Sequence, residues 1–204
     1  LMCDIAQGRC RVDALRRYIY ADRDRYPQSA LRMMFTSNHD ENSWSGSEFS
    51  RLGDAVKIMA ALTFVLPQGL PLIYTGQEVG YDHSFEFFDR DPLPSLEPND
   101  WSEFYRRLTA LKHRTPALDS GADGGSFIEI RNNAEDCLMT FVREKEGKRV
   151  ICIMNVSPWS IHTDYYTGIY AGVYRDVMTG EEYHFADHVE RDMAPWEFAI
   201  LEQI

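Results

Sequence analysis

Two short apolar runs, each ending in small and polar residues, constrain the fold of this chain more than any other feature. The first run, residues 31–36, is followed by Asn-His-Asp-Glu-Asn at positions 38–42, and the second, residues 69–74, is followed by Thr-Gly-Gln-Glu. Between them, apolar residues recur at helical spacing from about residue 48 until Pro67. Strand, helix and strand at this spacing predict a βαβ unit, whose two parallel strands end at the same edge.

The polar side chains at positions 38–42 allow two interpretations. A buried parallel strand that opens into an active site ends in this way, with hydrogen-bonding and ionisable groups directly after an apolar run. Asn, His and Asp also cap helices and fill turns, which would make the same residues structural. The stretch by itself leaves both interpretations open.

Two motifs in the sequence resemble those of a known family. Residues 35–40 read Phe-Thr-Ser-Asn-His-Asp, which is similar to the motif at the end of the seventh barrel strand in the α-amylase superfamily (glycoside hydrolase family 13). Residues 69–78 resemble the family motif G-x-P-x-I-Y-x-G-x-E at the eighth strand. The resemblance implies that residues 1–116 form the C-terminal part of a (β/α)8 catalytic barrel, a partial TIM barrel.

The resemblance also implies roles for individual residues. Asp40 would stabilise the positive charge that develops on the sugar ring in the transition state, and His39 would bind a hydroxyl of the same sugar. Asn38 would shape the strand end or assist substrate binding. Trp44 would stack on a glucosyl ring, and Glu78 would anchor the loop after the second strand.

A segment without clear periodicity, residues 80–99, follows the second motif. A loop of this length in a compact domain is usually functional. Within it, Asp89 and Arg90 are candidate ligands of sugar hydroxyls. Its phenylalanines at positions 85, 87 and 88 are expected to pin the loop to the body of the protein rather than to stack on sugar.

Two groups that glycoside hydrolysis requires are expected to lie outside this chain. The retaining mechanism needs a nucleophile and a general acid, two carboxyl groups about 5–5.5 Å apart. In the family these follow the fourth and fifth strands, and a complete barrel needs about 250 residues. One superficial match to the nucleophile motif, Arg11-Val12-Asp13-Ala14, falls in a helical pattern and lies too close to Asp40. The sequence therefore predicts part of a retaining α-glycosidase or α-amylase acting on α-glucans, with the isolated chain inactive.

The pattern of apolar and turn-forming residues changes at about residue 117. Strand-like runs recur at short intervals between turn signals such as Gly-Gly and Ser-Pro, at 126–131, 137–143, 149–155, 172–176, 183–185 and 197–201. They predict an antiparallel β-sandwich over residues 117–204, similar to the C-terminal domain of α-amylase relatives. The aromatic residues Trp159, Tyr165, Tyr166, Tyr170 and Tyr174 are expected to serve core and edge packing rather than a secondary sugar platform.

Charge and cysteine usage exclude several classes of function. The net charge is −11 and the pI is about 5.0, so the chain has no electrostatic footprint for nucleic acid. The four cysteines form no C-x-x-C pair, and those at positions 137 and 152 are predicted to be buried free thiols. No apolar window is long enough to span a membrane, and no signal peptide is recognised. The localisation stays unknown, and a periplasmic, cell-surface or secreted bacterial parent is compatible with the sequence.

The expected partners follow from the resemblance. They are an α-linked oligosaccharide or polysaccharide, together with the missing N-terminal half of the barrel or a second copy, because a partial barrel leaves strand edges unpaired. No cofactor and no metal site are expected in this chain; calcium is possible in a longer parent protein. The alternative function is a non-catalytic carbohydrate-binding module, or a structural fragment.

Overall fold

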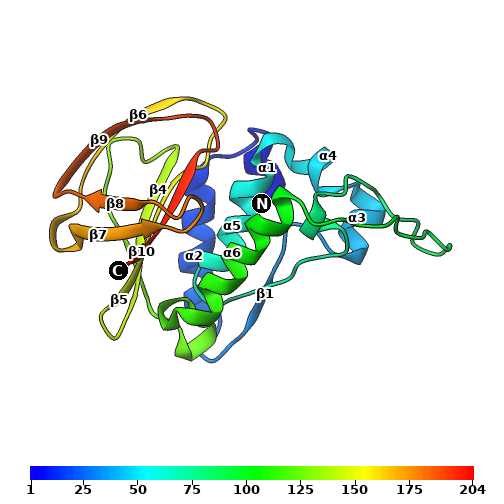
Figure 1. Ribbon diagram of the computed structural model, residues 1–204, viewed down its shortest axis with the longest axis horizontal. Coiled ribbons are helices and arrows are strands. Elements are labelled where there is room, and N and C mark those ends of the chain that lie inside the picture. Colours follow the sequence, from blue (N-terminus) through cyan, green and yellow to red (C-terminus); the bar gives the residue numbers. More distant parts are fainter.

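The computed structural model describes residues 1–204 and contains a helical part followed by a β-rich part (Figure 1). The first part comprises α1 (Met2–Ala6), α2 (Val12–Arg25), β1 (Arg32–Met34), α3 (His39–Ser45), α4 (Glu48–Leu52), α5 (Val56–Val65), β2 (Gly69–Pro71) and α6 (Asp100–Arg114). The second part comprises β3 (Ser126–Glu129), β4 (Leu138–Lys145), β5 (Lys148–Asn155), β6 (Ile161–Tyr166), β7 (Gly172–Asp176), β8 (Glu182–Phe185), β9 (His188–Met193) and β10 (Phe198–Gln203). Short 3-10 helices are η1 (Gly53–Ala55), η2 (Gln77–Val79), η3 (Pro116–Leu118), η4 (Gly121–Asp123) and η5 (Gly168–Tyr170).

The predicted parallel strand pair is present. β1 and β2 form a two-stranded sheet in which Arg32 lies opposite Gly69 and Met33 lies opposite Leu70. Helices α3, α4 and α5 make the connection between the two strands. Gly69 is needed at its position, because a Cβ atom there would lie 2.6 Å from the Met34 sulfur and 3.2 Å from the Thr63 carbonyl oxygen. The two strands therefore approach each other and α5 closely.

The polar segment after β1 forms a helix. Residues 39–45 form α3, and α4 follows after a new cap. That cap is Ser47, whose hydroxyl accepts the Ser50 N–H at 3.1 Å. The single helix expected over 48–66 is also interrupted, because Gly53 adopts a φ of 53° between α4 and α5.

Two antiparallel sheets make up the β-rich part. One has the strand order β3-β4-β5-β10-β7-β8, and the other is the pair β6-β9. Each run predicted from the sequence overlaps one strand of the larger sheet, but β6 and β9 were not predicted. Charged residues such as Asp164 and Glu190 are paired across these two strands. They obscure the alternation of buried and exposed residues in the sequence, in which Thr163 and Tyr165 face the interior.

The larger sheet is the middle of three layers. On one face, residues of β4, β5 and β10 such as Phe141, Cys152 and Ile200 join α2, α5 and α6 in one apolar cluster. On the other face, residues such as Val142 and Ile153 join Tyr165 of β6 and Val189 of β9 in a second cluster. Because β4 and β5 are buried on both faces, they read as continuous apolar runs in the sequence. The same sheet thus carries both the helical part and the outer ribbon.

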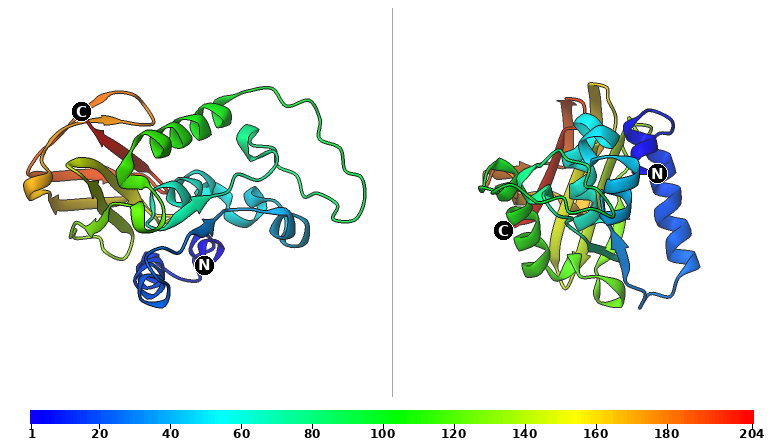
Figure 2. Two further views of the ribbon diagram at one scale, coloured as in Figure 1. Left: turned by 90° about the horizontal axis from the view of Figure 1, so that it is seen from below. Right: turned by 90° about the vertical axis from the view of Figure 1, so that its right-hand side faces the viewer.

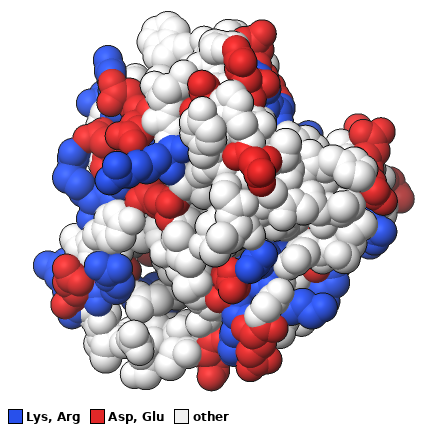
Figure 3. Space-filling view, turned by 90° about the vertical axis from the view of Figure 1, so that its left-hand side faces the viewer, with Lys and Arg blue, Asp and Glu red and all other residues white.

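The cysteines are unpaired, and the charges on the surface are of mixed sign. All four cysteines are free; Cys152 is fully buried, and burial raises the pKa of its thiol, whereas Cys137 is only half-buried just before β4. On the β-rich face, Lys and Arg lie among Asp and Glu rather than in a continuous basic patch (Figure 3). None of the helices has the length and apolar character needed to cross a membrane.

Candidate functional site

The polar cluster at the end of β1 forms the beginning of α3. The Asn38 side-chain oxygen accepts the Glu41 N–H at 2.7 Å, so this residue is the N-cap of the helix. His39 and Asp40 occupy the first turn, and their side chains are 69% and 60% exposed. The His39 Nε2 atom lies 3.6 Å from an Asp40 carboxylate oxygen. The structural interpretation is therefore confirmed for Asn38, whereas the active-site interpretation of His39 and Asp40 stays a prediction.

Arg51 of α4 fixes the turn that connects β1 to α3. Its guanidinium donates to the carbonyl oxygen of Thr36 at 2.9 Å, to the Ser37 hydroxyl at 3.1 Å and to the Gly46 carbonyl oxygen at 3.0 Å. Thr36 and Ser37 are themselves buried. The Arg51 guanidinium therefore fixes the backbone that leads to His39 and Asp40. Because the donor is charged, these hydrogen bonds are stronger than neutral ones.

A buried carboxyl group links the C-terminal ends of β1 and β2. Glu48 is 3% exposed; one of its oxygens accepts hydrogen bonds from the Thr36 hydroxyl at 2.7 Å and from the Gln77 amide. Gln77 also donates to the Thr36 hydroxyl at 2.7 Å and accepts the Tyr74 N–H at 2.5 Å. The second Glu48 oxygen is buried without a partner. Burial raises the pKa of the Glu48 carboxyl, and the two hydrogen bonds only partly oppose this effect.

Asn42 attaches the long segment 80–99 to α3. Its side-chain amide donates to the His83 carbonyl oxygen at 2.8 Å and accepts the Phe85 N–H at 2.7 Å, and its own carbonyl oxygen accepts the Ser84 hydroxyl at 2.6 Å. Asp91 then closes the loop, because it pairs with His83 at 2.8 Å and accepts the Glu86 N–H at 3.0 Å. The hydrogen bond from His83 lowers the pKa of Asp91. In Figure 2 the whole segment is an arc that leaves the body after β2 and returns at α6.

An exposed group of aromatic rings lies beside His39. Phe87 stacks on the imidazole with ring centroids 6.3 Å apart and contacts Trp44 at 5.2 Å. Phe88 contacts Phe87 at 4.8 Å and Trp44 at 6.1 Å. Trp44 is 65% exposed and Phe88 82% exposed. Exposed aromatic side chains gathered in this way are a feature of ligand-binding surfaces, so the group is a candidate binding surface.

The structure brings most of the predicted site residues to one region. Asn38, His39, Asp40 and Trp44 all lie in or at the start of α3. Asp89 and Arg90 lie in the attached loop, are exposed, and make no side-chain hydrogen bond or ion pair. The phenylalanines divide: Phe85 packs against Tyr74 and His83, as expected of a pinning residue, whereas Phe87 and Phe88 are largely exposed.

Three supporting residues were missed by the sequence analysis: Asn42, Glu48 and Gln77. Gln77 stands inside the second motif, and Asn42 lies two residues after the first, in the polar run 38–42; these positions are the signals that would have indicated them. Glu48 carries no such signal, because it resembles any carboxylate at the start of a helix. Glu78 contributes its backbone carbonyl, which accepts the Ser102 hydroxyl at 2.7 Å. Asp13 lies in the first turn of α2 and pairs with Arg17, as expected of a surface carboxylate.

The arrangement is suited to binding a polyhydroxylated ligand. Exposed rings offer stacking surfaces, and His39 and Asp40 offer a hydrogen-bond donor and an anionic acceptor beside them. No group of three or more His, Cys, Asp or Glu side chains is arranged to hold a metal ion.

Comparison with known proteins gives one family match and several relatives. Residues 129–196 match the family described as the C-terminal all-beta domain of alpha amylase. The chain is 27% identical over 149 residues to a Beta/alpha-amylase of Paenibacillus polymyxa, covering 71% of this chain and 12% of that protein. It is 29% identical over 119 residues to a 4-alpha-glucanotransferase of Thermotoga neapolitana, covering 58% of this chain and 26% of that protein.

The fold is also similar to that of a solved structure. The noncanonic maltogenic alpha-amylase AmyB from Thermotoga neapolitana superposes with a TM-score of 0.80 at 18% identity, covering 98% of this chain and 48% of that chain. This chain therefore spans about half the length of that structure, and 12% and 26% of the lengths of the two curated relatives.

Replacing Glu48 with Gln tests the buried carboxyl. Below the pKa of the unfolded chain, both folded and unfolded states carry the proton, and no difference arises. As pH rises above that value, the unfolded state ionises first, so the wild-type protein loses stability until the raised pKa of the folded state is passed, by about 1.4 kcal/mol for each unit of the rise. We expect the free energy of unfolding of Glu48→Gln, measured by urea titration from pH 4 to 8, to lack this loss.

Glu41→Gln is the matched control, because Glu41 is exposed on α3. An equal pH dependence in wild type and Glu48→Gln would show that the folded state holds Glu48 ionised at no cost.

Replacing Asn42 with Ala tests the attachment of the loop. Loss of two hydrogen bonds worth about 1 kcal/mol each favours local opening by roughly 30-fold. We expect amide hydrogen exchange at residues 81–91 to become faster by this factor, most clearly at Phe85. Ser43→Ala, on the same helix, should leave the exchange unchanged. Full protection of Phe85 in Asn42→Ala would contradict the assignment.

Proposed function

We propose that this chain, which belongs with the α-amylase superfamily, forms part of a retaining α-glycosidase that acts on α-glucans such as starch and maltodextrins. The observation that carries the proposal is the exposed group of aromatic rings beside His39 and Asp40. A glucosyl unit stacked on Trp44 or Phe87 has its ring hydroxyls within reach of both polar side chains. The names of the relatives, amylases and a glucanotransferase, support the same substrate class.

Asp40 acts in this proposal as a stabiliser of charge. The sugar ring gains positive charge as the transition state approaches an oxocarbenium ion, and a carboxylate fixed at the start of α3 opposes that charge. His39 donates to a hydroxyl of the same sugar. Neither residue is nucleophile or proton donor, and Asn38 contributes by fixing the helix start. Asp89 and Arg90 extend the site along the glucan from the attached loop.

The nucleophile and the general acid come from a segment outside this chain. We take β1 and β2 as the seventh and eighth strands of a (β/α)8 barrel, with residues 1–116 as its C-terminal part and residues 117–204 as the domain that follows. The parallel register and the common edge at which Asp40 and Gln77 lie support this assignment. The isolated chain is accordingly inactive.

Glucan binding and turnover test the function. Purified chain is expected to release no product from a chromogenic maltooligosaccharide but to bind maltoheptaose weakly, as measured by NMR titration. Trp44→Ala should weaken binding about tenfold, the effect of losing roughly 1.4 kcal/mol of stacking. Trp159→Ala is the matched control, since both tryptophans are 65% exposed.

Two outcomes would contradict the proposal. Hydrolysis by the isolated chain that Asp40→Asn abolishes would mean that the chain holds its own nucleophile and acid. Binding lost in Trp159→Ala and retained in Trp44→Ala would identify the β-rich part as a non-catalytic carbohydrate-binding module.

In the full product of the gene, Asp40→Asn should lower kcat by a factor on the order of 100 to 1,000.

The strand pair also predicts association. β1 and β2 have unpaired outer edges, and opposite residues Met33 and Leu70 are 59% and 42% exposed. Such edges and faces pair with other chains, either the remaining barrel or a second copy. Light scattering of the purified chain should give a mass above 23.6 kDa, reduced by Met33→Lys but not by Ile169→Lys, a control at an exposed residue of η5. A stable monomer would count against it.

A further inference from the structure

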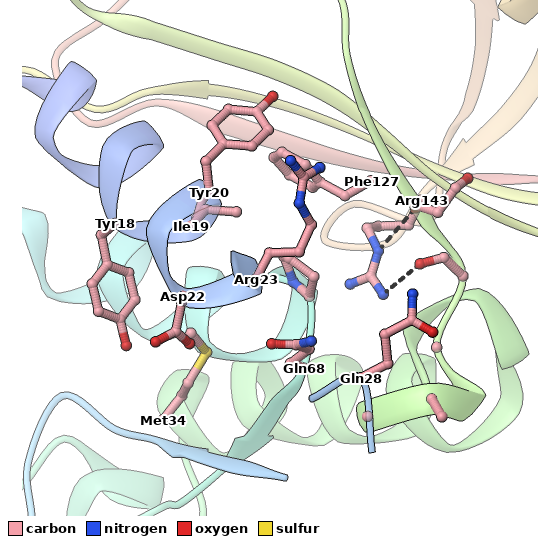
Figure 4. Close-up of a pocket in the computed structure, with 16 residues that line it drawn as sticks. Tyr18, Ile19, Tyr20, Asp22, Arg23, Gln28, Met34, Gln68, Phe127 and Arg143 are labelled. Atoms are coloured by element: carbon pink, nitrogen blue, oxygen red, sulfur yellow. Dashed lines mark hydrogen bonds between the residues drawn. The ribbon is translucent and has the colours of Figure 1, made fainter. Parts of the chain in front are cut away.

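A second hollow lies away from His39 and Asp40. It has a volume of about 300 Å³ and is enclosed by α2, the segments that precede β1 and β2, the loop after η4, and β4 (Figure 4). Gln28 precedes β1 and Gln68 precedes β2, so the pocket lies toward the end of the strand pair opposite to the candidate glucan site. Its volume falls at the lower end of the range for small-molecule sites.

A buried cation without a counter-ion forms one wall of this pocket. Arg143 of β4 is 1% exposed, and no carboxylate lies within 4 Å of its guanidinium. It donates instead to the carbonyl oxygens of Val65 at 2.8 Å, Ser126 at 3.2 Å and Gly125 at 3.3 Å, which leaves two of its five N–H groups without a protein acceptor. Burial lowers the pKa of Arg143 to about 10, so the group stays charged at neutral pH.

The surroundings of Arg143 add little negative charge. Lys112 of α6 lies near, and burial together with the charge of Arg143 lowers the pKa of Lys112 to about 8. Asp119 favours the charged form of both cations from a distance. Within the pocket wall the one carboxylate, Asp22, is already paired with Arg32 at 2.6 Å. A buried charge of this kind is unfavourable unless it is paired.

A second cation reaches the pocket from α2. The Arg23 side chain is 63% exposed, and its contact with Asp24 is long, at 3.6 Å. Figure 4 shows the Arg143 guanidinium near the side chains of Gln28 and Gln68, whereas the Arg23 guanidinium lies toward Phe127 and Tyr20, 5.1 Å from the centroid of the Tyr20 ring. Gln68 has a φ of 61°, a conformation that favours glycine, and its side chain lines the pocket.

We propose that this pocket binds a small organic oxyanion, a phosphate ester or a carboxylate with a polar body. The Arg143 guanidinium provides a planar N–H fork that suits such anions, and Arg23 adds a second positive charge to the pocket wall. The amides of Gln28 and Gln68 bind hydroxyls, and the rings of Tyr18 and Phe127 cover the remaining surface. An anion in the pocket supplies the counter-charge that Arg143 lacks. This site is independent of the proposed glucan chemistry.

Thermal unfolding and calorimetry of the full chain test the site. The probes are glucose 6-phosphate and gluconate, with glucose as the neutral control and NaCl to hold ionic strength constant. We expect at least one of the two anions to raise Tm saturably, because a ligand that binds the folded state stabilises it. A preference for glucose 6-phosphate identifies a phosphate site, and a preference for gluconate identifies a carboxylate site.

Variants connect the effect to the pocket. Arg23→Gln and Gln68→Gly should each raise Kd at least fivefold; both are expected to fold, since Arg23 is largely exposed and glycine suits the backbone at position 68. Arg17→Gln is the matched control, an exposed arginine of α2 outside the pocket, and should change Kd less than twofold. Tm shifts no larger than those of NaCl, or equal Kd values in wild type, Arg23→Gln and Gln68→Gly, would overturn the proposal.

Discussion

The hydrogen bonds that converge on the Glu48 carboxyl hold together the region on which the candidate site depends. They join Thr36 at the end of β1, Gln77 after β2 and the first residue of α4, three points that are far apart in the sequence. Two three-residue strands make too few backbone hydrogen bonds to define this geometry alone. Glu48 is only 3% exposed, and burial of a carboxyl group is energetically unfavourable. The raised pKa of Glu48 reflects this cost of burial.

Side chains around the candidate site make hydrogen bonds that backbone groups make in regular secondary structure. Asn38 replaces a backbone acceptor at the start of α3, and Asn42 pairs with the loop as a strand would, through one donor and one acceptor. Arg51 satisfies carbonyl oxygens that no N–H reaches. The exposed residues His39, Asp40 and Trp44 are therefore fixed at their backbone, while their side chains stay available to a ligand.

Much of this structure can be predicted from local pattern. The parallel pair and six of the eight later strands follow from apolar runs and turn residues, since burial on both faces leaves a strong signal. β6 and β9 were not predicted, because their exposed faces carry charged residues such as Asp164 and Glu190, which are paired across the two strands. Of the site, the motif residues were found, whereas the role of Glu48 was not, because nothing in the sequence around a carboxylate tells whether its side chain turns inward.

The attachment of the segment 80–99 has a consequence for how such a protein diversifies. Every hydrogen bond that holds the loop near α3 involves residues 82–86 or Asp91, and none involves residues 87–90. The tip can thus exchange its side chains, including Phe87, Phe88, Asp89 and Arg90, without disturbing the frame. The side chains at the tip of the loop can therefore change by substitution while the hydrogen bonds that hold the loop stay the same.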